Sequence, residues 1–300
     1  MTSVSNVQSI RPAATEKSTN GAASQLFDLG RISRGGKKPD GLLITLEGGE
    51  GSGKTTQAIR LYIKLSNLGV PVMLAREPGS TRLGNYVRNW VKEQSDTSPL
   101  AETLLFAAAR AQLIEDAVRP ALKDGRVVIL DRFVDSTLAY QGYGRRFDLQ
   151  KIREINALVT SGLEPRLTIL LDLEPHFALK RLGSAEQPHL NVEGANVKVR
   201  LDPADQRRFE KESVEFHERV LRGYREIASQ EKGRWAVIQA QQPRHRIADA
   251  IWKRVRALLI SQFTERYESL LEQRGGYRFS SREEARMPTS GNQILMANSW

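Results

Sequence analysis

Residues 42–57 read LLITLEGGEGSGKTTQ, and this stretch decides the fold and the kind of site that the chain carries. Its first five residues form a short apolar and branched run, which predicts a buried parallel strand. Four glycines follow, at positions 48, 49, 51 and 53, and Lys54 and Thr55 come directly after the last of them. A helix is expected next, because apolar residues recur on one helical face at positions 58, 61, 65 and 68.

Residues 48–55 match the pattern G-x-x-x-x-G-K-[ST] at every required position. Glycines let the backbone curl so that successive N–H groups point at a phosphate, and the helix N-terminus adds partial positive charge. Lys54 can reach the β and γ phosphates of a nucleotide, and the Thr55 hydroxyl can hold Mg²⁺. The alternative is a chance glycine-rich turn, which the flanking strand and helix disfavour. The expected phosphate-binding residues are Gly48, Gly49, Glu50, Gly51, Ser52, Gly53, Lys54 and Thr55.

The composition sets outer limits on the function. Three hundred residues allow one large domain or two small ones, and 40% hydrophobic residues suffice for a sizeable core. Cysteine is absent, which excludes a disulfide framework and a thiolate metal site and fits a reducing compartment. No stretch is long and apolar enough to cross a bilayer. The net charge of +10 is compatible with nucleic acid, a membrane surface or small anions, and no nucleic-acid-binding motif accompanies it.

Five apolar runs alternate with helical patterns along residues 41–263. This alternation predicts an α/β fold with a parallel five-stranded sheet and helices on both faces. The expected strands are residues 42–46, 70–75, 127–131, 167–172 and 235–240. The main expected helices beyond the loop are residues 83–93, 98–122 with a bend before Pro120, 150–159, 175–182, 206–229 and 246–263. Ligands of such sheets collect at the carboxyl ends of the strands, where the loop glycines, Arg76 and Asp131 fall.

Three segments lack a core-facing pattern. Residues 1–40 are polar and are expected to be a disordered extension, with no secretory signal because no apolar segment follows the start. Residues 264–300 are expected to be a second extension, largely disordered. Residues from about 183 to 208 are polar and contain Gly and Pro, which predicts a lid within the domain of residues 41–263.

Two pairs of residues outside the loop could carry chemistry. Asp131 ends the third apolar strand, where an acid commonly organises Mg²⁺, and Arg132 beside it offers a planar fork for phosphate oxygens. An ordinary ion pair at a strand end is the alternative. Phe106 and Arg110 are four residues apart and share a helix face, which suits stacking on a nucleobase and hydrogen bonding to it. From spacing alone, a core phenylalanine and a solvated arginine remain the simpler interpretation.

Taken together, these motifs closely resemble those of the bacterial thymidylate kinases. The stretches GGEGSGKTT at 48–56, REPG at 76–79, LFAAARAQ at 105–112 and DR…ST…AYQG at 131–142 occur in that family's order and at similar intervals. The resemblance covers about residues 41–261 and neither extension. It implies a P-loop nucleoside monophosphate kinase fold with a lid. It also implies a cytoplasmic homodimer that uses ATP and Mg²⁺ to phosphorylate dTMP to dTDP, with no nucleic acid or membrane as a partner.

The resemblance also implies a role for each matching residue. The loop would hold the phosphates of ATP, with Lys54 and Arg132 as catalytic cations and Thr55 and Asp131 at the metal. Glu50 matches the acid that faces the 3′-hydroxyl of the acceptor sugar. The other expected acceptor-site residues are Phe106, which would stack on thymine; Arg110, which would bond to a base carbonyl; Thr137, at the base edge; Tyr140, which would crowd the 2′ position; and Arg76 and Ser136, near the acceptor phosphate.

The chain departs from the family pattern at two places. The loop holds no basic residue at positions 49–52, so the catalytic arginine is expected to come from the lid. Arg181 is favoured by alignment, and Arg200, Arg207 and Arg208 are alternatives. Gln239 stands where the family often has Asp beside the adenine, which leaves the donor base contact open.

Two other functions remain open on the sequence. The same fold could act on dUMP, on a modified pyrimidine deoxynucleotide or on a nucleoside. A basic P-loop protein that binds nucleic acid without catalysis is the second alternative, and salt-sensitive DNA binding would favour it.

Overall fold

The structure is a computed structural model that describes residues 41–94, 96–183, 212–273 and 293–294. All described residues lie in one structural unit of the chain. The expected N-terminal extension, the lid from residue 184 onward and most of the expected C-terminal extension lie outside the described residues. The domain limits therefore stay a prediction.

The core of the fold is one parallel sheet whose strands follow the order β5-β4-β1-β3-β2-β6. The five predicted strands are confirmed. A sixth, two-residue strand pairs with β2 from within the predicted C-terminal extension, and two residues are too few to show a period in the sequence. The strands are β1 (Leu42–Glu47), β2 (Val72–Arg76), β3 (Val127–Asp131), β4 (Leu167–Asp172), β5 (Trp235–Gln239) and β6 (Gln293–Ile294).

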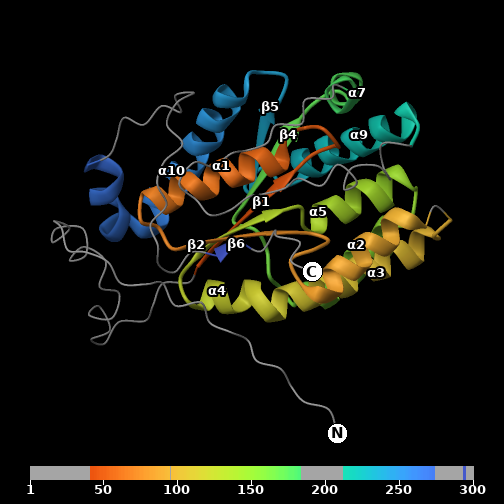
Figure 1. Cartoon of the computed structure of the whole chain (residues 1–300), viewed down its shortest axis with the longest axis horizontal. Coiled ribbons are helices and arrows are strands. Elements are labelled where there is room, and N and C mark those ends of the chain that lie inside the picture. The colour runs from red at the N-terminus through yellow and green to blue at the C-terminus, as the bar shows by residue number, and fades with distance from the viewer. Residues whose placement is uncertain (1–40, 95, 184–211, 274–292, 295–300) are drawn as a thin grey trace, which may run out of the picture. The chain divides into compact units, whose positions relative to one another are not determined.

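Helices cover both faces of the sheet, which explains why β1, β3 and β4 are buried at every position. Leu42, Ile44 and Leu46 pack in a cluster with α1 and α10, whereas Leu43 packs with α3, η2 and α4 on the other face (Figure 1). The helices are α1 (Lys54–Asn67), α2 (Arg82–Glu93), α3 (Pro99–Leu113), η2 (Ile114–Val118), α4 (Arg119–Lys123), α5 (Val134–Thr137), η3 (Leu138–Gly144), α6 (Leu149–Thr160), α7 (Pro175–Gly183), α9 (Val214–Gln230) and α10 (Arg244–Gln273), of which η2 and η3 are π-helical.

Several helices differ from the expected pattern. The long helix expected from Ser98 onward is interrupted where its bend is predicted, by the π-helical turn η2, which ends two residues before Pro120, whose ring cannot continue the α-helical hydrogen bonds. The helical stretch α5–η3 after β3 is not predicted, because its apolar residues are few and irregularly spaced. Helix α10 continues to Gln273, ten residues beyond the expected end at 263. No described helix is long and apolar enough to span a bilayer.

The strand register places the carboxyl ends of β1, β2 and β3 side by side at one edge of the sheet. Asp131 is the register partner of Leu46 in β1 and of Arg76 in β2. Because the strands are parallel, the loop after β1, the turn after β3 and the end of β2 meet at one edge. This edge is where the sequence places the candidate site.

Candidate active site

The glycine loop between β1 and α1 is tightly packed on the end of the sheet. Gly48 has a φ of +140°, and a Cβ there would lie 2.6 Å from the carbonyl oxygen of Leu171 in β4. Gly51 has a φ of +68°, and a Cβ there would meet the carbonyl oxygen of Ala178 in α7 at 2.8 Å. Both positions therefore need glycine, for backbone conformation and for space. Helix α7, which leads into the expected lid, lies directly against the loop.

Lys54 is the first residue of α1 and is buried. Its Nζ donates to the carbonyl oxygen of Gly49 at 2.7 Å and to Oγ of Ser52 at 3.4 Å, so the amine lies inside the curl of the loop. Burial, with a further contribution from the charge of Arg132, lowers the pKa of Lys54 to about 8. A phosphate bound in the loop would add negative charge next to this buried ammonium and stabilise its charged form.

Thr55 and Asp131 form the expected metal position. Thr55 Oγ1 donates to Oδ2 of Asp131 at 2.5 Å. The second carboxylate oxygen, Oδ1, is buried and accepts no hydrogen bond from any described residue. The described residues contain no group of three His, Cys, Asp or Glu side chains that could hold a metal. Mg²⁺ is usually held by few protein oxygens together with phosphates and water, and the hydroxyl of Thr55 beside the carboxylate of Asp131 fits that kind of site.

Arg132 joins the loop to the turn after β3. One Nη1 donates to the carbonyl oxygen of Gly48 at 3.3 Å and to Oγ of Ser136 at 3.3 Å. Nη2 donates to Oε1 of Glu50 at 2.5 Å and to Oη of Tyr140 at 3.2 Å. Four residues that the sequence analysis singles out are thus gathered around one guanidinium.

Glu50 balances the charge of Arg132, and Tyr140 makes hydrogen bonds to both residues. Tyr140 Oη donates to Oε1 of Glu50 at 3.0 Å, and the guanidinium lies over the Tyr140 ring, 4.8 Å from its centroid. Burial alone would raise the pKa of Glu50, but the charges of Arg132 and Lys54 outweigh it and hold that pKa below its usual value. Glu50 is therefore ionised, and its ion pair with Arg132 is almost shielded from solvent, with side-chain exposures of 17% and 16%.

Arg110 lies in a second group next to the first, because α5 supplies Ser136 to the first and Thr137 to the second. Only 2% of Arg110 is exposed. Nε donates to Oε2 of Glu77 at 2.7 Å, and Nη1 donates to Oδ1 of Asn156 at 2.7 Å. Nη2 donates to Oγ1 of Thr137 at 2.8 Å and to the carbonyl oxygen of Phe133 at 3.2 Å. The interpretation of Arg110 as a solvated charge is therefore wrong.

Phe106 and Arg76 are the two remaining residues that the sequence places at the acceptor site. Phe106 shares a face of α3 with Arg110, and its half-buried side chain packs with Val87 and Val91 of α2. Arg76 ends β2 beside Asp131, and its backbone N–H donates to Oγ of Ser80 at 2.9 Å. Their roles toward a ligand stay predictions.

Arg181 lies on the other side of the loop, away from Arg132. Its Nη2 donates at 2.7 Å to the carbonyl oxygen of Ala240, directly after β5. Burial, together with the nearby charge of Arg244, lowers the pKa of Arg181. Gln239 donates from Nε2 to Oδ2 of Asp172 at 3.1 Å. The other candidate lid arginines lie outside the described residues.

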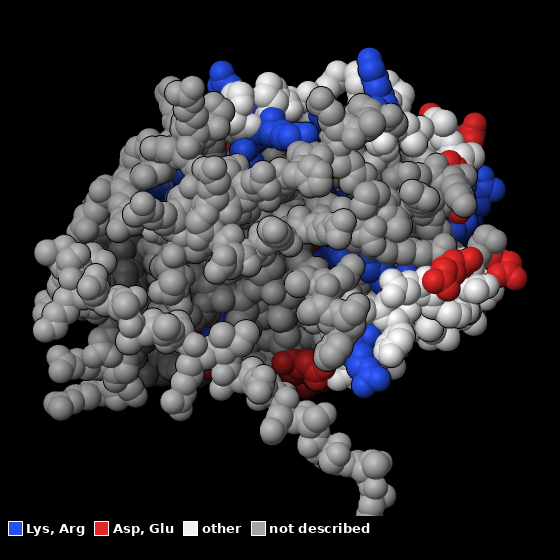
Figure 2. All heavy atoms as spheres, viewed as in Figure 1, with Lys and Arg blue, Asp and Glu red and all other residues white. Residues whose placement is uncertain are grey.

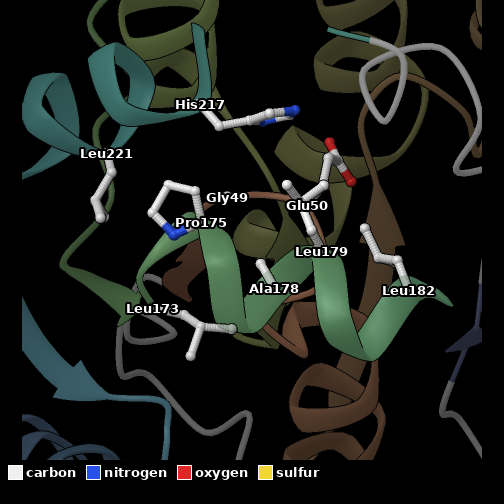
Figure 3. Close-up of a pocket in the computed structure, with 9 residues that line it drawn as sticks. All are labelled: Gly49, Glu50, Leu173, Pro175, Ala178, Leu179, Leu182, His217 and Leu221. Atoms are coloured by element: carbon white, nitrogen blue, oxygen red, sulfur yellow. The ribbon is translucent and has the colours of Figure 1, made fainter. Parts of the chain in front are cut away.

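A small hollow lies where the loop, α7 and α9 meet (Figure 3). Gly49 and Glu50 reach it from the loop, and His217 and Leu221 reach it from α9. Apolar side chains from the α7 region form most of the remaining lining: Leu173, Pro175, Ala178, Leu179 and Leu182. Helix α7 therefore contacts the loop through an apolar surface.

Several residues of the site do not stand out in the sequence analysis. Glu77 and Asn156 hold Arg110, and Glu47 and Tyr224 hold Ser136. Gln141 is buried, and its amide nitrogen donates to no described residue, so it could donate to a ligand. A glutamate closing the otherwise apolar run LLITLE was a signal for Glu47, because an unpaired charge is rarely buried. Tyr224 and Asn156 lie on ordinary amphipathic helices, and nothing in the sequence marks them.

The class of the protein follows from the groups that touch the loop. A loop of this form binds nucleotide phosphates, and an arginine in direct contact with it suits the transfer of a phosphoryl group. The chain is thus a P-loop phosphotransferase in class.

Comparison with known proteins gives the family. The sequence profile described as thymidylate kinase matches residues 46–251. The thymidylate kinase of Deinococcus radiodurans is 44% identical over 216 residues, covering 72% of this chain and 96% of that protein. That of Desulforudis audaxviator is 42% identical over 222 residues, covering 73% and 92%. A crystal structure of thymidylate kinase from Ehrlichia chaffeensis aligns with a TM-score of 0.55 and 32% identity, covering 72% of this chain and 99% of that one.

The chain belongs to the thymidylate kinase family, as residues 48–142 lead one to expect. Its reaction is the ATP-dependent phosphorylation of dTMP.

Proposed function

We propose that this phosphorylation is carried out by two groups of residues that meet at Arg132. The loop and Lys54 bind the phosphates of ATP, and Arg132 with Ser136 binds the phosphate of dTMP. The observation that carries the proposal is the hydrogen bond from Arg132 to the carbonyl oxygen of Gly48. Phosphoryl transfer requires the two phosphates in line and close together, and this contact puts their binding groups side by side.

Charge neutralisation supplies most of the rate in this account. Two polyanions repel each other, and buried cations opposite them act without the reorganisation that water would need. Among the described residues, buried Lys54 and largely buried Arg132 are cations in direct contact with the loop. The acceptor phosphate is already an anionic nucleophile near neutral pH, so no strongly activated base is needed.

Thr55 and Asp131 would hold Mg²⁺ beside the loop. When bound, the ion would neutralise charge on the phosphate oxygens. Oδ1 of Asp131 is the oxygen that supports this assignment, because it is buried and accepts no hydrogen bond from the described residues.

The acceptor base lies, in this proposal, against Arg110. A guanidinium has five N–H donors, and described residues accept four hydrogen bonds from that of Arg110. One donor on Nη1 then remains for a ligand. Such a site suits a carbonyl oxygen, as in thymine or uracil, and rejects the amino group that cytosine carries at the same position. Phe106 stacks on the base in the same proposal, and Thr137 and Gln141 lie at its edge.

The sugar lies between Glu50 and Tyr140. Tyr140 is held rigidly by hydrogen bonds to Glu50 and Arg132, and its ring packs edge-on against Phe216 and Tyr224. A ring fixed on this many sides leaves little room for adjustment, which supports exclusion of a 2′-hydroxyl. Glu50 can accept a hydrogen bond from the 3′-hydroxyl.

Arg181 is proposed as the arginine that the loop itself lacks. Its hydrogen bond to Ala240 places it at the end of β5, beside the expected adenine loop. A shift from that carbonyl to the transferred phosphate would be needed for catalysis. Arg200, Arg207 and Arg208 remain the alternatives.

A comparison of dTMP with thymidine and dUMP as acceptors tests this function. Because Arg132 binds the acceptor phosphate, kcat/KM for thymidine is expected to be ~30-fold or more lower than for dTMP. The value for dUMP, which lacks one methyl group, is expected to fall about tenfold or more. A coupled assay that measures ADP formation gives all three values. Equal rates with thymidine would contradict a site built around an acceptor phosphate.

We further propose that the chain forms a homodimer through α2 and α3. Large apolar side chains on these two helices are exposed, with Tyr86 at 61%, Trp90 at 44% and Leu104 at 49%. Exposed apolar groups gathered in one region are typical of an interface between proteins. Figure 2 shows one face of the molecule, on which described side chains of both charges are visible.

Light scattering tests the dimer. The substitution Trp90→Glu is expected to shift the chain from dimer to monomer, because a charge would be buried without a partner. Val237→Glu is the matched control, since Val237 is also exposed, at 50%, but lies on the edge strand β5. A monomeric wild-type chain at micromolar concentration, or a dimer that Trp90→Glu leaves intact, would contradict the proposal. The cytoplasmic location stays a prediction.

A further inference from the structure

Glu47 is a buried carboxylate in the middle of the site, and no substrate would touch it. It ends β1, one residue before the glycine loop, and is 0% exposed. Oε1 accepts from the backbone N–H of Phe133 at 2.7 Å. Oε2 accepts from Oγ of Ser136 at 2.5 Å and from Oη of Tyr224 at 2.9 Å. Described protein donors thus occupy both of its oxygens.

Two of these donors, Phe133 and Ser136, follow Arg132 closely in the turn after β3 and in α5. Arg132 has a φ of +76°, a backbone conformation that residues other than glycine rarely adopt and that is strained. Such a conformation persists only where the surrounding structure holds it. The turn is held on both sides: Arg132 N–H donates to the carbonyl oxygen of Leu46 at 3.0 Å, and Phe133 N–H donates to Glu47.

We propose that Glu47 is a positioning residue, which holds the turn after β3 so that the Arg132 guanidinium stays directed at the acceptor phosphate. The inference rests on the proposed role of Arg132. Through Ser136, the same carboxylate also fixes the hydroxyl that hydrogen-bonds to Arg132. Through Tyr224, it ties the turn to α9, the helix that follows the expected lid.

The hydrogen bonds of Glu47, rather than its charge, carry this role. Burial, together with the charge of Asp135, raises the pKa of Glu47 to about 7, so the environment stabilises its charge less than water does. Asp135 itself is 0% exposed and is held by both Nη atoms of Arg234 at 2.8 Å. Glutamine can replace the arrangement without charge: its oxygen would accept from Phe133, and its amide would donate to the two hydroxyl oxygens.

Binding of dTMP, thymidine and ATP, measured by titration calorimetry, tests the inference in Glu47→Ala and Glu47→Gln. In Glu47→Ala the dissociation constant for dTMP is expected to rise about tenfold or more. Those for thymidine, which lacks the phosphate, and for ATP should stay within about twofold, since neither contacts Arg132 as an acceptor phosphate does. Glu47→Gln should bind dTMP nearly as well as the wild type. A merely structural role would weaken thymidine and dTMP alike.

Thr45→Val is the matched control, because Thr45 lies on the same face of β1 and makes a buried hydrogen bond to Thr168 at 3.0 Å, on β4 rather than in the turn. It should leave all three dissociation constants unchanged. If Glu47→Ala does not fold, Tyr224→Phe removes one donor without a cavity and should weaken dTMP by about threefold, whereas Tyr62→Phe, another buried tyrosine, should not.

Three results would overturn the inference: equal weakening of thymidine and dTMP, loss of dTMP binding in Glu47→Gln as large as in Glu47→Ala, or no change of dTMP affinity in Tyr224→Phe. Arg132→Ala separates this failure from failure of the proposed function. If Arg132→Ala weakens dTMP selectively while the Glu47 variants do not, only the positioning role is wrong. If Arg132→Ala does not discriminate dTMP from thymidine, the assignment of Arg132 itself fails.

Discussion

Replacing Arg132 by alanine is expected to lower kcat/KM for dTMP by about a thousandfold. Two effects act together. The acceptor phosphate loses the guanidinium that would neutralise it, and Glu50, now without its ion-pair partner, is left as a buried negative charge near the incoming phosphate. The affinity for an ATP analogue should change little, because Lys54 and the loop amides remain. Steady-state kinetics with each substrate varied in turn measure both quantities.

The control for this variant is Arg119→Ala. Arg119 lies on α4 and makes an exposed ion pair with Glu115, one helical turn away, at 2.9 Å. Exposed pairs of this kind contribute about 0–1 kcal/mol, so the control should keep near wild-type activity. A loss confined to ATP affinity in Arg132→Ala would place this arginine on the donor side and contradict the account.

Replacing Lys54 by methionine is expected to lower kcat by about a hundred- to a thousandfold, with KM for dTMP nearly unchanged. Methionine keeps much of the apolar stem but removes the charge opposite the transferred phosphate. Lys64→Met is the matched control: Lys64 is also buried on α1, but its amine lies over Trp252 rather than in the loop. Equal losses in the two variants would show that stability of α1, not charge in the loop, is being measured.

The lowered pKa of Lys54 also predicts proton uptake on binding ATP. In the protein without bound nucleotide, Lys54 has a pKa of about 8, so most molecules carry it unprotonated at pH 8.5 or above. A bound phosphate raises that pKa, so binding should take up part of a proton there, and affinity should fall as the pH rises above 8. Calorimetry of a non-hydrolysable ATP analogue in two buffers with different ionisation heats measures the uptake. Lys54→Met should show none from this source; an undiminished uptake would assign the proton elsewhere.

The fold could be predicted from the sequence because its central strands β1, β3 and β4 are buried on both faces. Continuous apolar runs such as LLITL and VVIL leave no other reading inside an alternating pattern. The helical stretch α5–η3 could not be predicted, because its helical form depends on tertiary packing against α9 rather than on its own periodicity. Strand β6 contains only two residues, too few for any period.

The site was predictable where chemistry requires a fixed spacing and obscure where it depends on contacts across the fold. Lys54, Thr55, Asp131 and Arg132 stand at positions that phosphate binding dictates, and the structure brings them together. Spacing alone favoured a solvated Arg110, because the partners that bury it come from β2, α5 and α6. Asn156, one of those partners, lies 46 residues away in the chain.

The central claim is that a pyrimidine deoxynucleotide phosphate faces the loop from the side of Arg132, and acceptor selectivity tests it most directly. With ATP saturating, kcat/KM should be about a hundredfold or more higher for dTMP than for UMP, which lacks the methyl group and carries a 2′-hydroxyl against Tyr140. A coupled assay with both acceptors on the same preparation measures the ratio. Comparable values for UMP and dTMP would contradict the roles given to Arg110 and Tyr140.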